Sequence, residues 1–440
     1  MKNKTIPLIF FILSISFFIF VFYKSEIIHS GIKGEYYSKY YFLAIIFNIF
    51  SLISFFLKKD LLMKIFIVFF SLVFSLYLIE AYFFLTSFEK KQNRISESKL
   101  LEIKKSKLSY DFRSKYEFYQ ESKKSNPKFV LSINPEIFKK QNNKNIFPVS
   151  GISHRPTVHG NENGYFTFYL SDRYGFNNHD RDWDKKEIDY LLIGDSFVHG
   201  AFVNENHSIA GNLRDKNKNT VINLSYKGNG PLIKFATLRE YLDKTKPKKV
   251  LWFYFEGNDL YELTDELQNK TLAKYLKDDL FNQNLSMKQS IIDEIILNEL
   301  KKLEKKNFKK FLKLNNVRSL TIEKSVKYPD WKQKTSNEFF QILKKTKNIL
   351  KKKNIEFYFI YLPEYDRYSQ NLEDDKTYND YEKVLNKISS FDIKIIDIHK
   401  EVFSDYPDPL ALFPFRSDGH YNETGYTLIG KKILNLLNKP

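Results

Sequence analysis

Three long apolar segments open the chain. Residues 5–23 and 40–57 carry no charged side chain, and residues 65–88 carry only Glu80. Each segment is long enough to cross the hydrocarbon core of a bilayer as a helix, so residues 1–88 are predicted to form a membrane region with three transmembrane helices. Glu80 is either an intramembrane functional group or, as its position eight residues from the end of the third segment favours, a residue near the outer headgroups.

A different pattern begins near residue 186, where short apolar runs alternate with amphipathic stretches. The apolar runs predict buried strands and the amphipathic stretches predict helices. Strands are expected at 188–193, 219–224, 249–255, 355–362 and 393–398. Helices are expected near 206–215, 231–245, 336–353, 377–389 and 423–437. The alternation predicts an α/β fold, a flavodoxin-like three-layer α/β/α sandwich around a mostly parallel five-stranded sheet.

The segments between and within these regions are less regular. Residues 89–128 are charged and are expected to form a helical stalk or linker, and residues 129–185 contain short β-like runs. Residues 164–170 alternate in the manner of an exposed strand. The predicted domains are therefore 1–88, a stalk and β-containing lead-in at 89–185, and an α/β domain at 186–440.

The α/β pattern is interrupted by residues 260–335. Their apolar residues recur at helical spacing and a run of lysines follows. The insertion is either a helical segment with a solvated lysine face, which is favoured, or a lid that steers an anionic substrate. The apolar residues are Ile291, Ile292, Ile295, Ile296, Leu297 and Leu300, and the lysines are Lys301, Lys302, Lys305, Lys306, Lys309 and Lys310.

The net charge and the absence of cysteine limit the partners and the chemistry of the chain. The chain has 70 Lys and Arg against 52 Asp and Glu, a net charge of +18. Only ten of the basic residues are Arg, the side chain that grips bases and phosphates in bidentate fashion, so no nucleic-acid partner is expected. An anionic surface, such as lipid headgroups or an acidic glycan, is a partner that the net charge allows. The chain has no Cys, which excludes disulfides, cysteine-ligated zinc and thiol nucleophiles.

The distribution of lysines predicts the topology. Lys2 and Lys4 precede the first apolar segment, and residues 58–64 between the second and third contain three lysines. The bias favours an N-terminus inside the cell, and three spans then place everything after residue 88 on the periplasmic or extracellular side. A cleaved signal peptide is the alternative for the first segment, but no small-residue cleavage site follows it.

Four polar blocks occupy the ends of the predicted strands or the entry to the last helix. Gly194-Asp195-Ser196 follows the first strand, residues 223–230 follow the second, Glu256-Gly-Asn258-Asp follows the third, and Ser417-Asp418-Gly-His420 precedes the C-terminal helix. Each block alone could be an ordinary turn or helix cap. The carboxyl ends of parallel strands meet at one edge of the sheet, where ligands bind.

The four blocks in this order resemble those of the SGNH hydrolases, also called GDSL-type esterases and lipases, and the resemblance covers about residues 170–440. Residues 172–177 also resemble the segment that precedes the first block in this family, although a plain hairpin is the simpler explanation. The resemblance implies an ester-cleaving serine enzyme with the fold described above.

The chemistry of the residues agrees with this implication. Ser196 is the candidate nucleophile, His420 the candidate base because its pKa lies near neutrality, and Asp418 the carboxylate that would hold the imidazole tautomer. In the family two residues usually separate the Asp from the His, whereas here only Gly419 does. His199 is a rival base, but it is expected to be a polar residue at the rim of the site.

By resemblance, the oxyanion would be stabilised by the backbone N–H groups of Ser196 and Gly228 and by the side-chain amide of Asn258. Gly230 competes with Gly228 for this role, and Asp259 is expected to stabilise the loop. No cofactor or metal is expected, because the chain has neither a Walker glycine-lysine pattern nor a His-x-x-x-His pair.

These features predict a membrane-anchored serine hydrolase that cleaves an ester, with acetyl the simplest acyl group, on a surface or secreted glycan. The first alternative is an O-acetyltransferase that uses the same residues and requires a membrane partner protein, since three spans are too few for a multi-span acyl exporter. The second alternative is a non-catalytic glycan-binding or assembly subunit.

Overall fold

The computed structural model describes residues 4–28, 34–90, 97–139, 146–214, 218–304, 311–314, 317–318, 336–369, 378 and 380–438. The chain divides into two compact units. The first comprises residues Met1–Phe88 and Asn307–Pro329, and the second comprises Glu89–Lys306 and Asp330–Pro440.

The first unit contains the three apolar helices that the sequence predicts. All three are long and apolar enough to cross a membrane, and phenylalanines pack between them, with Phe10 at their centre. Glu80 is fully buried in this unit, and its carboxylate accepts a hydrogen bond from the N–H of Val317 at 2.9 Å. The elements are α1 (Thr5–Phe22), η1 (Tyr23–Ile28), α2 (Gly34–Ile53), η2 (Ser54–Phe56) and α3 (Lys59–Lys90).

The second unit begins with a small three-stranded sheet and three helices. β2 (Pro156–Gly160) lies between β1 (Val130–Leu131), to which it is parallel, and β3 (Thr167–Leu170), to which it is antiparallel. β3 alternates buried and exposed residues, as the sequence predicts for residues 164–170. The helices are α4 (Glu97–Ser106), α5 (Lys115–Ser125) and α6 (Glu136–Lys139).

The main sheet has five parallel strands in the order β5-β4-β6-β7-β8. This is the doubly wound order of flavodoxin-like folds, and the predicted fold class is confirmed. All five predicted strands are present, with bounds that differ by at most two residues. They are β4 (Ile188–Ile193), β5 (Val221–Asn223), β6 (Pro247–Phe255), β7 (Glu356–Leu362) and β8 (Lys394–Asp397).

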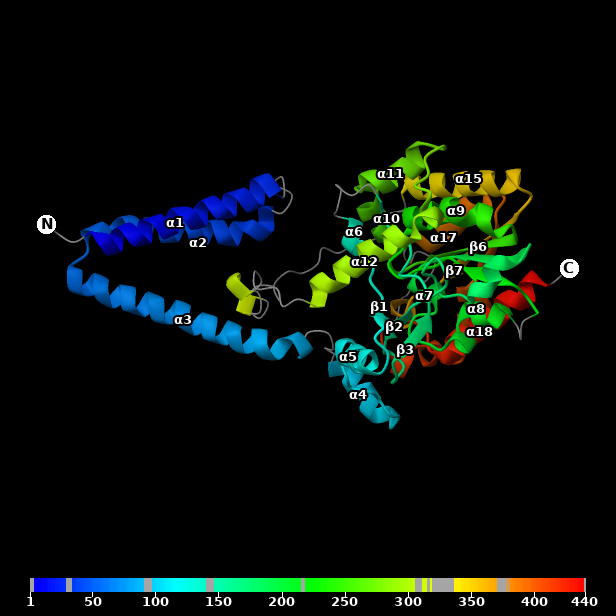
Figure 1. Ribbon diagram of the computed structural model, residues 1–440, viewed down its shortest axis with the longest axis horizontal. Coiled ribbons are helices and arrows are strands. Elements are labelled where there is room, and N and C mark those ends of the chain that lie inside the picture. The colour runs from blue at the N-terminus through cyan, green and yellow to red at the C-terminus, as the bar shows by residue number, and fades with distance from the viewer. Residues whose placement is uncertain are drawn as a thin grey trace. The chain divides into compact units, whose positions relative to one another are not determined.

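Helices cover both faces of this sheet because the strands are apolar on both faces. Along β6, Trp252 and Tyr254 belong to the hydrophobic core on one face and Leu251 and Phe253 to the core on the other. α9 (Pro231–Thr245), α15 (Asn337–Lys352) and α17 (Tyr381–Ser389) pack on the first face, and α8 (Ile209–Arg214) and α18 (Glu423–Leu437) on the second. Figure 1 shows the two layers on opposite sides of β6 and β7.

The described part of the 260–335 insertion is helical. Ile292, Ile296 and Leu300 face the core from α12, whereas Ile291 is exposed. Residues 305–310 lie outside the described residues, so the alternative of a lysine-rich lid stays a prediction. The helices are α10 (Asp259–Leu267), α11 (Lys270–Lys277), η5 (Leu285–Met287) and α12 (Gln289–Glu304).

Short helices occupy the loops of the α/β unit. They are η3 (Asp180–Asp184), α7 (Ser196–His199), η4 (Glu205–His207), α16 (Asp366–Ser369), η8 (His399–Phe403), η9 (Pro409–Leu412) and η10 (Pro414–Arg416).

Candidate active site

The polar blocks meet at the carboxyl edge of the main sheet. Ser196 follows β4, the loop 224–230 follows β5, and Asn258 follows β6. β4 lies between β5 and β6. The connection from β4 leads to β5 on one side, and the connection from β5 leads back to β6 on the other side of β4. This is the switch point at which doubly wound sheets bind their ligands.

The turn after β4 presents Ser196 at the start of α7. Asp195 caps the helix, and its carboxylate accepts a hydrogen bond from the N–H of Phe197 at 3.0 Å. Gly194 is required by space, because a Cβ there would lie 2.5 Å from the Cγ2 of Val198. The turn is therefore tight, and the Ser196 N–H belongs to the first turn of the helix, where N–H groups have no partner within the helix.

His420 reaches Ser196 from the loop before α18. Its Nε2 lies 2.8 Å from the Ser196 Oγ, and its ring packs against Phe197 and Phe202 with centroids 4.4 and 4.9 Å away. Asn422 begins α18 by accepting a hydrogen bond from the N–H of Gly425 at 3.0 Å. The packed ring and the capped helix hold the imidazole where it can accept the serine proton.

The carboxylate that contacts His420 belongs to Glu162. Both Glu162 oxygens lie 3.1 Å from Nδ1, and Oε2 also accepts a hydrogen bond from the His420 N–H at 2.8 Å. Asp418, the carboxylate that the sequence predicts for this role, is exposed and is not hydrogen-bonded to His420 among the described residues. The structure differs here from the expectation, since Asp418 precedes His420 by only two residues and Glu162 fills the position behind the ring.

Gly419 makes room for Glu162. A Cβ at position 419 would lie 2.9 Å from the Glu162 Oε2, so a side chain there would press on the carboxylate. Glu162 lies 258 residues from His420 in the chain, and no motif in the sequence marks it as a partner of the histidine.

The Glu162–His420 pair changes the pKa of both groups. Burial disfavours the charged imidazolium, but the attraction of the Glu162 carboxylate and its hydrogen bond outweigh burial and raise the pKa of His420 above its ordinary value. Burial likewise disfavours the charged carboxylate, but the neighbouring His420 outweighs it and lowers the pKa of Glu162. Glu162 is therefore ionised near neutrality and stabilises positive charge on the ring.

Three groups in the loops at the carboxyl edge of the sheet can stabilise an oxyanion. The N–H groups of Ser196 and Gly228 are not hydrogen-bonded to any described residue. Asn258 is the N-cap residue of α10, yet its side chain does not cap the helix, and its Oδ1 is buried without a partner among the described residues. N–H donors held at such a place stabilise the charge that develops on a carbonyl oxygen under attack.

The structure separates the two candidate glycines of the β5–α9 loop. The Gly230 N–H donates to the Glu266 Oε1 at 2.7 Å, so it is already engaged at the start of α9. Gly228 has a φ of +75°, which glycine adopts without strain. Gly228 is therefore the donor that the loop leaves available.

Asp259 has the structural role that the sequence suggests. Its carboxylate forms a fully buried ion pair with the Lys234 Nζ, with both distances 2.6 Å, and accepts a hydrogen bond from the Phe255 N–H at 3.2 Å. It ties the start of α10 to α9 beneath the loop that carries Asn258.

His199 does not lie at the rim of the site. It is fully buried, and its ring packs against His159, Tyr169 and Tyr226 with centroids 4.5 to 5.1 Å away. Burial lowers the pKa of His199 to about 3, so the ring stays neutral. The expectation of a polar rim residue is wrong, because α7 turns this side chain into the interior.

Two asparagines fix the end of α7. The Asn223 Nδ2 donates to the carbonyl of Val198 at 2.6 Å, and the Asn177 Nδ2 donates to the carbonyl of His199 at 2.9 Å. The last carbonyls of a helix have no partner within it. These bonds satisfy them from β5 and from the segment 172–177, which places that segment next to the short helix that carries Ser196.

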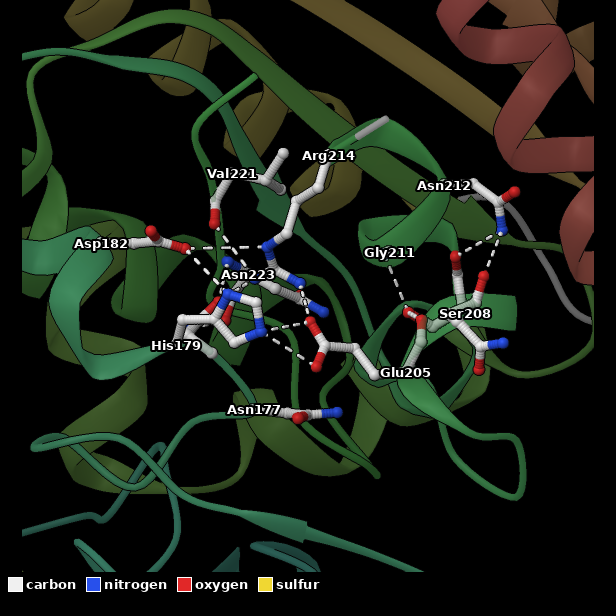
Figure 2. Close-up of polar contacts among 12 residues, drawn as sticks. Asn177, His179, Asp182, Glu205, Ser208, Gly211, Asn212, Arg214, Val221 and Asn223 are labelled. Atoms are coloured by element: carbon white, nitrogen blue, oxygen red, sulfur yellow. Dashed lines mark hydrogen bonds and ion pairs between the residues drawn. The ribbon is translucent and has the colours of Figure 1, made fainter. Parts of the chain in front are cut away.

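A network of charged side chains surrounds the Arg214 guanidinium (Figure 2). The Arg214 guanidinium donates to the Glu205 Oε1 at 2.7 Å and to the carbonyl of Val221 at 3.2 Å, and its Nε lies 3.7 Å from the Asp182 Oδ2. His179 Nε2 lies 2.9 Å from the Glu205 Oε1. The network joins α8, β5 and η3.

Cavities lie beside the segment 172–177 and beside the loops that carry Glu162 and His420. One of about 310 Å³ is lined by residues that include His159, Tyr169, Asn177, Val203 and Glu205, but not by Ser196 or His420. The other, of about 210 Å³, is lined by Asn163, Tyr165, Phe415 and Asn422 among others, and so lies beside the loops that carry Glu162 and His420. Among the described residues, no group of three or more His, Asp or Glu side chains could hold a metal ion.

Comparison with known proteins gives similarity at the level of structure only. No family model matches the chain, and no curated protein matches it. Twenty-five solved chains resemble it. They include a protein from Desulfitobacterium hafniense DCB-2 described as lipolytic and of the G-D-S-L family, with 15% identity over 57% of this chain and 99% of that one and a TM-score of 0.32.

Two further solved structures are similar to the same extent. A lipase/acylhydrolase from Enterococcus faecalis is 13% identical over 57% of this chain and 95% of its own, with a TM-score of 0.32. An acetyl xylan esterase is 12% identical over 57% of this chain and 100% of its own, also with a TM-score of 0.32.

Proposed function

We propose that this protein is a membrane-anchored serine hydrolase that cleaves an ester through an acyl-enzyme on Ser196. The observation that carries the proposal is the chain of contacts from the Ser196 Oγ to the His420 Nε2, at 2.8 Å, and from Nδ1 to the Glu162 carboxylate, at 3.1 Å. Nucleophile, base and orienting group within hydrogen-bond reach are the elements of acyl transfer by serine.

In the first half-reaction the Ser196 Oγ attacks the ester carbonyl while His420 Nε2 takes the hydroxyl proton. The Glu162 carboxylate stabilises the imidazolium that forms, and the N–H donors of Ser196, Gly228 and Asn258 stabilise the oxyanion. The tetrahedral intermediate collapses when His420 returns the proton to the alcohol oxygen. The C–O bond of the ester breaks, the alcohol leaves, and the acyl group stays on Ser196.

In the second half-reaction a water molecule takes the place of the alcohol. His420 removes a proton from the water, the resulting hydroxide attacks the acyl carbonyl, and His420 returns the proton to Ser196 as the acid leaves. Every step uses the same donors, so one geometry serves both halves.

The proposed substrate is an acetyl ester on a glycan outside the cell. The support is the combination of a membrane region, whose lysine bias favours an external α/β unit, with a site at the carboxyl edge of the sheet. If a sugar hydroxyl attacks the acyl-enzyme in place of water, the same residues make the protein an O-acetyltransferase. If Ser196 does not react at all, the protein is a non-catalytic glycan-binding subunit.

The test is to incubate the full-length protein, in detergent, with an acetylated oligosaccharide, with and without an unacetylated acceptor. Acetate released at a rate that does not depend on the acceptor, and lost in Ser196→Ala, is expected. Transfer of acetyl to the acceptor with little acetate would replace the hydrolase by the transferase. If a folded protein shows neither hydrolysis nor transfer, the glycan-binding subunit is the remaining function.

A further inference from the structure

The loop after β5 lies against a segment from the N-terminal part of the α/β unit. The Asn134 side chain is 3.5 Å from the place that a Cβ of Gly228 would occupy, and the Tyr226 side chain is hydrogen-bonded to the backbone of Ile133. Residues 226–228 and 132–134 therefore run side by side, and whatever projects between them lies next to the oxyanion donor Gly228.

Two lysines project into this place. Lys115 Nζ donates to the Ser132 Oγ at 3.3 Å, and its amine lies close enough to that of Lys227, the residue before Gly228, for each lysine to affect the pKa of the other. Neither lysine forms an ion pair with a carboxylate of any described residue. Glu117, in the first turn of the same helix as Lys115, is engaged at the helix cap, where it accepts the N–H of Ser114.

The surroundings add further positive potential. Lys115 is the first residue of α5, where the helix dipole is positive. Burial lowers the pKa of Lys115 to about 8 and, together with Lys115 itself, lowers that of Lys227 well below its ordinary value. Two neighbouring buried amines without a counter-charge cannot both hold a proton at low cost, and a bound anion would favour the charged form of both.

A polar side chain beside Gly228 also lacks partners. Both polar atoms of the Asn229 amide are buried without a hydrogen-bond partner among the described residues, and Asn229 is 1% exposed. Buried polar groups are nearly always hydrogen-bonded, so an unpartnered amide N–H donor next to Gly228 indicates a place that is completed by a ligand.

We propose that Lys115 and Lys227, with Asn134 and Asn229, bind an oxyanion, a carboxylate or a phosphate, on the alcohol part of the ester substrate. The inference rests on the proposed function and names its substrate class, an acetylated glycan that carries negative charge close to the acetyl group. Lysines suit this role because they act as compact point charges toward carboxylate or phosphate oxygens.

The test compares esters that differ in charge, with the full-length protein in detergent. The substrates are an acetylated glucuronic acid oligosaccharide, an acetylated hexose phosphate and an acetylated glucose oligosaccharide. The wild type is expected to hydrolyse at least one anionic ester with a higher kcat/KM than the neutral ester. The preferred ester distinguishes carboxylate from phosphate.

Lys115→Met and Lys227→Met are each expected to lower the anionic-to-neutral ratio of kcat/KM about tenfold, mainly through KM, which corresponds to about 1.4 kcal/mol. Lys115→Arg and Lys227→Arg should restore most of it. Lys124→Met, an exposed lysine on the same helix, is the control and should leave the ratio unchanged. An unchanged ratio in both Met variants, or no preference in the wild type, would overturn the inference.

Failure of the proposed function gives a different result. In that case no ester is hydrolysed and Ser196 is not labelled by a phosphonate. Calorimetry with the unacetylated glucuronic acid oligosaccharide then tests the site alone. If the oligosaccharide binds and the Lys115→Met and Lys227→Met variants bind it tenfold more weakly, the anion site is supported. If wild type and variants do not differ, the anion site is contradicted.

Discussion

Glu162 is the carboxylate that contacts His420 in the structure, whereas the sequence predicts Asp418 for this role. Its carboxylate accepts hydrogen bonds from both the backbone N–H and the Nδ1 side of His420. Glu162→Gln is expected to lower kcat by about 10²–10⁴-fold, because an amide favours the wrong tautomer and cannot stabilise the imidazolium. The measurement is steady-state hydrolysis of a chromogenic acetyl ester.

Asp418→Asn is the matched control for this substitution. Asp418 is exposed and lies two residues from His420, so kcat should change by roughly twofold at most, as for a surface substitution. If the Asp418 variant is the inactive one and Glu162→Gln retains full activity, Asp418 is the orienting carboxylate after all.

The pH dependence of kcat/KM follows from the same pair. His420 acts as a base only when it is neutral, and Glu162 raises its pKa above the ordinary 6.5. Activity should therefore fall as the pH drops through a midpoint above 6.5. In Glu162→Gln the residual activity should show a midpoint at lower pH, because the attraction that favours the imidazolium is gone. An unshifted midpoint would mean that another group titrates.

At the scale of elements, the catalytic turn depends on bonds to the end of α7. Asn223→Ala removes the amide that reaches the Val198 carbonyl at 2.6 Å and should cost about 1–3 kcal/mol of stability, since it leaves a buried carbonyl without a partner. It should also lower kcat at least tenfold, because α7 carries Ser196. Denaturant unfolding and steady-state kinetics measure the two effects.

Asn219→Ala is the control for this element. The Asn219 Nδ2 donates to the Leu213 carbonyl at 2.9 Å, so the variant loses a similar bond at the end of α8 and not of α7. Its kcat should stay near that of the wild type. Equal losses of kcat in both variants would show that general loosening, and not the position of α7, limits the reaction.

The elements themselves could be predicted from the sequence because their patterns are local. The apolar runs that become β4 and β7 and the amphipathic stretches that become α9 and α18 follow from spacing alone. Contacts between distant segments could not be predicted. The approach of Glu162 to His420 and the burial of His199 depend on how the β2–β3 loop and α7 pack, and no local pattern encodes that packing.

Gly228 and Gly230 illustrate the same limit within one loop. The sequence contains two glycines two residues apart, and the hydrogen bond from the Gly230 N–H to Glu266 shows which N–H group is already engaged. Glu266 belongs to α10, 36 residues further along the chain. The sequence of the loop alone therefore cannot show which glycine N–H is engaged, because the acceptor lies on a distant helix.

At the scale of the whole molecule, three apolar helices precede the α/β unit. The lysine bias predicts that the chain after residue 88 lies outside the cytoplasm. A reporter that is active only in the periplasm, fused after residue 100, should be active. A cytoplasm-only reporter that is active at that site would place the α/β unit inside and make an intracellular lipid ester the better substrate.

The central claim is that Ser196 is a nucleophile activated by His420, and covalent labelling by a fluorophosphonate tests it most directly. The full-length protein in detergent should be labelled once, and mass spectrometry of its peptides should locate the label on Ser196. Labelling should be lost in Ser196→Ala and become at least a hundredfold slower in His420→Ala, with folding checked by thermal unfolding. A folded wild-type protein that is not labelled, or that is labelled at another serine, would contradict the account.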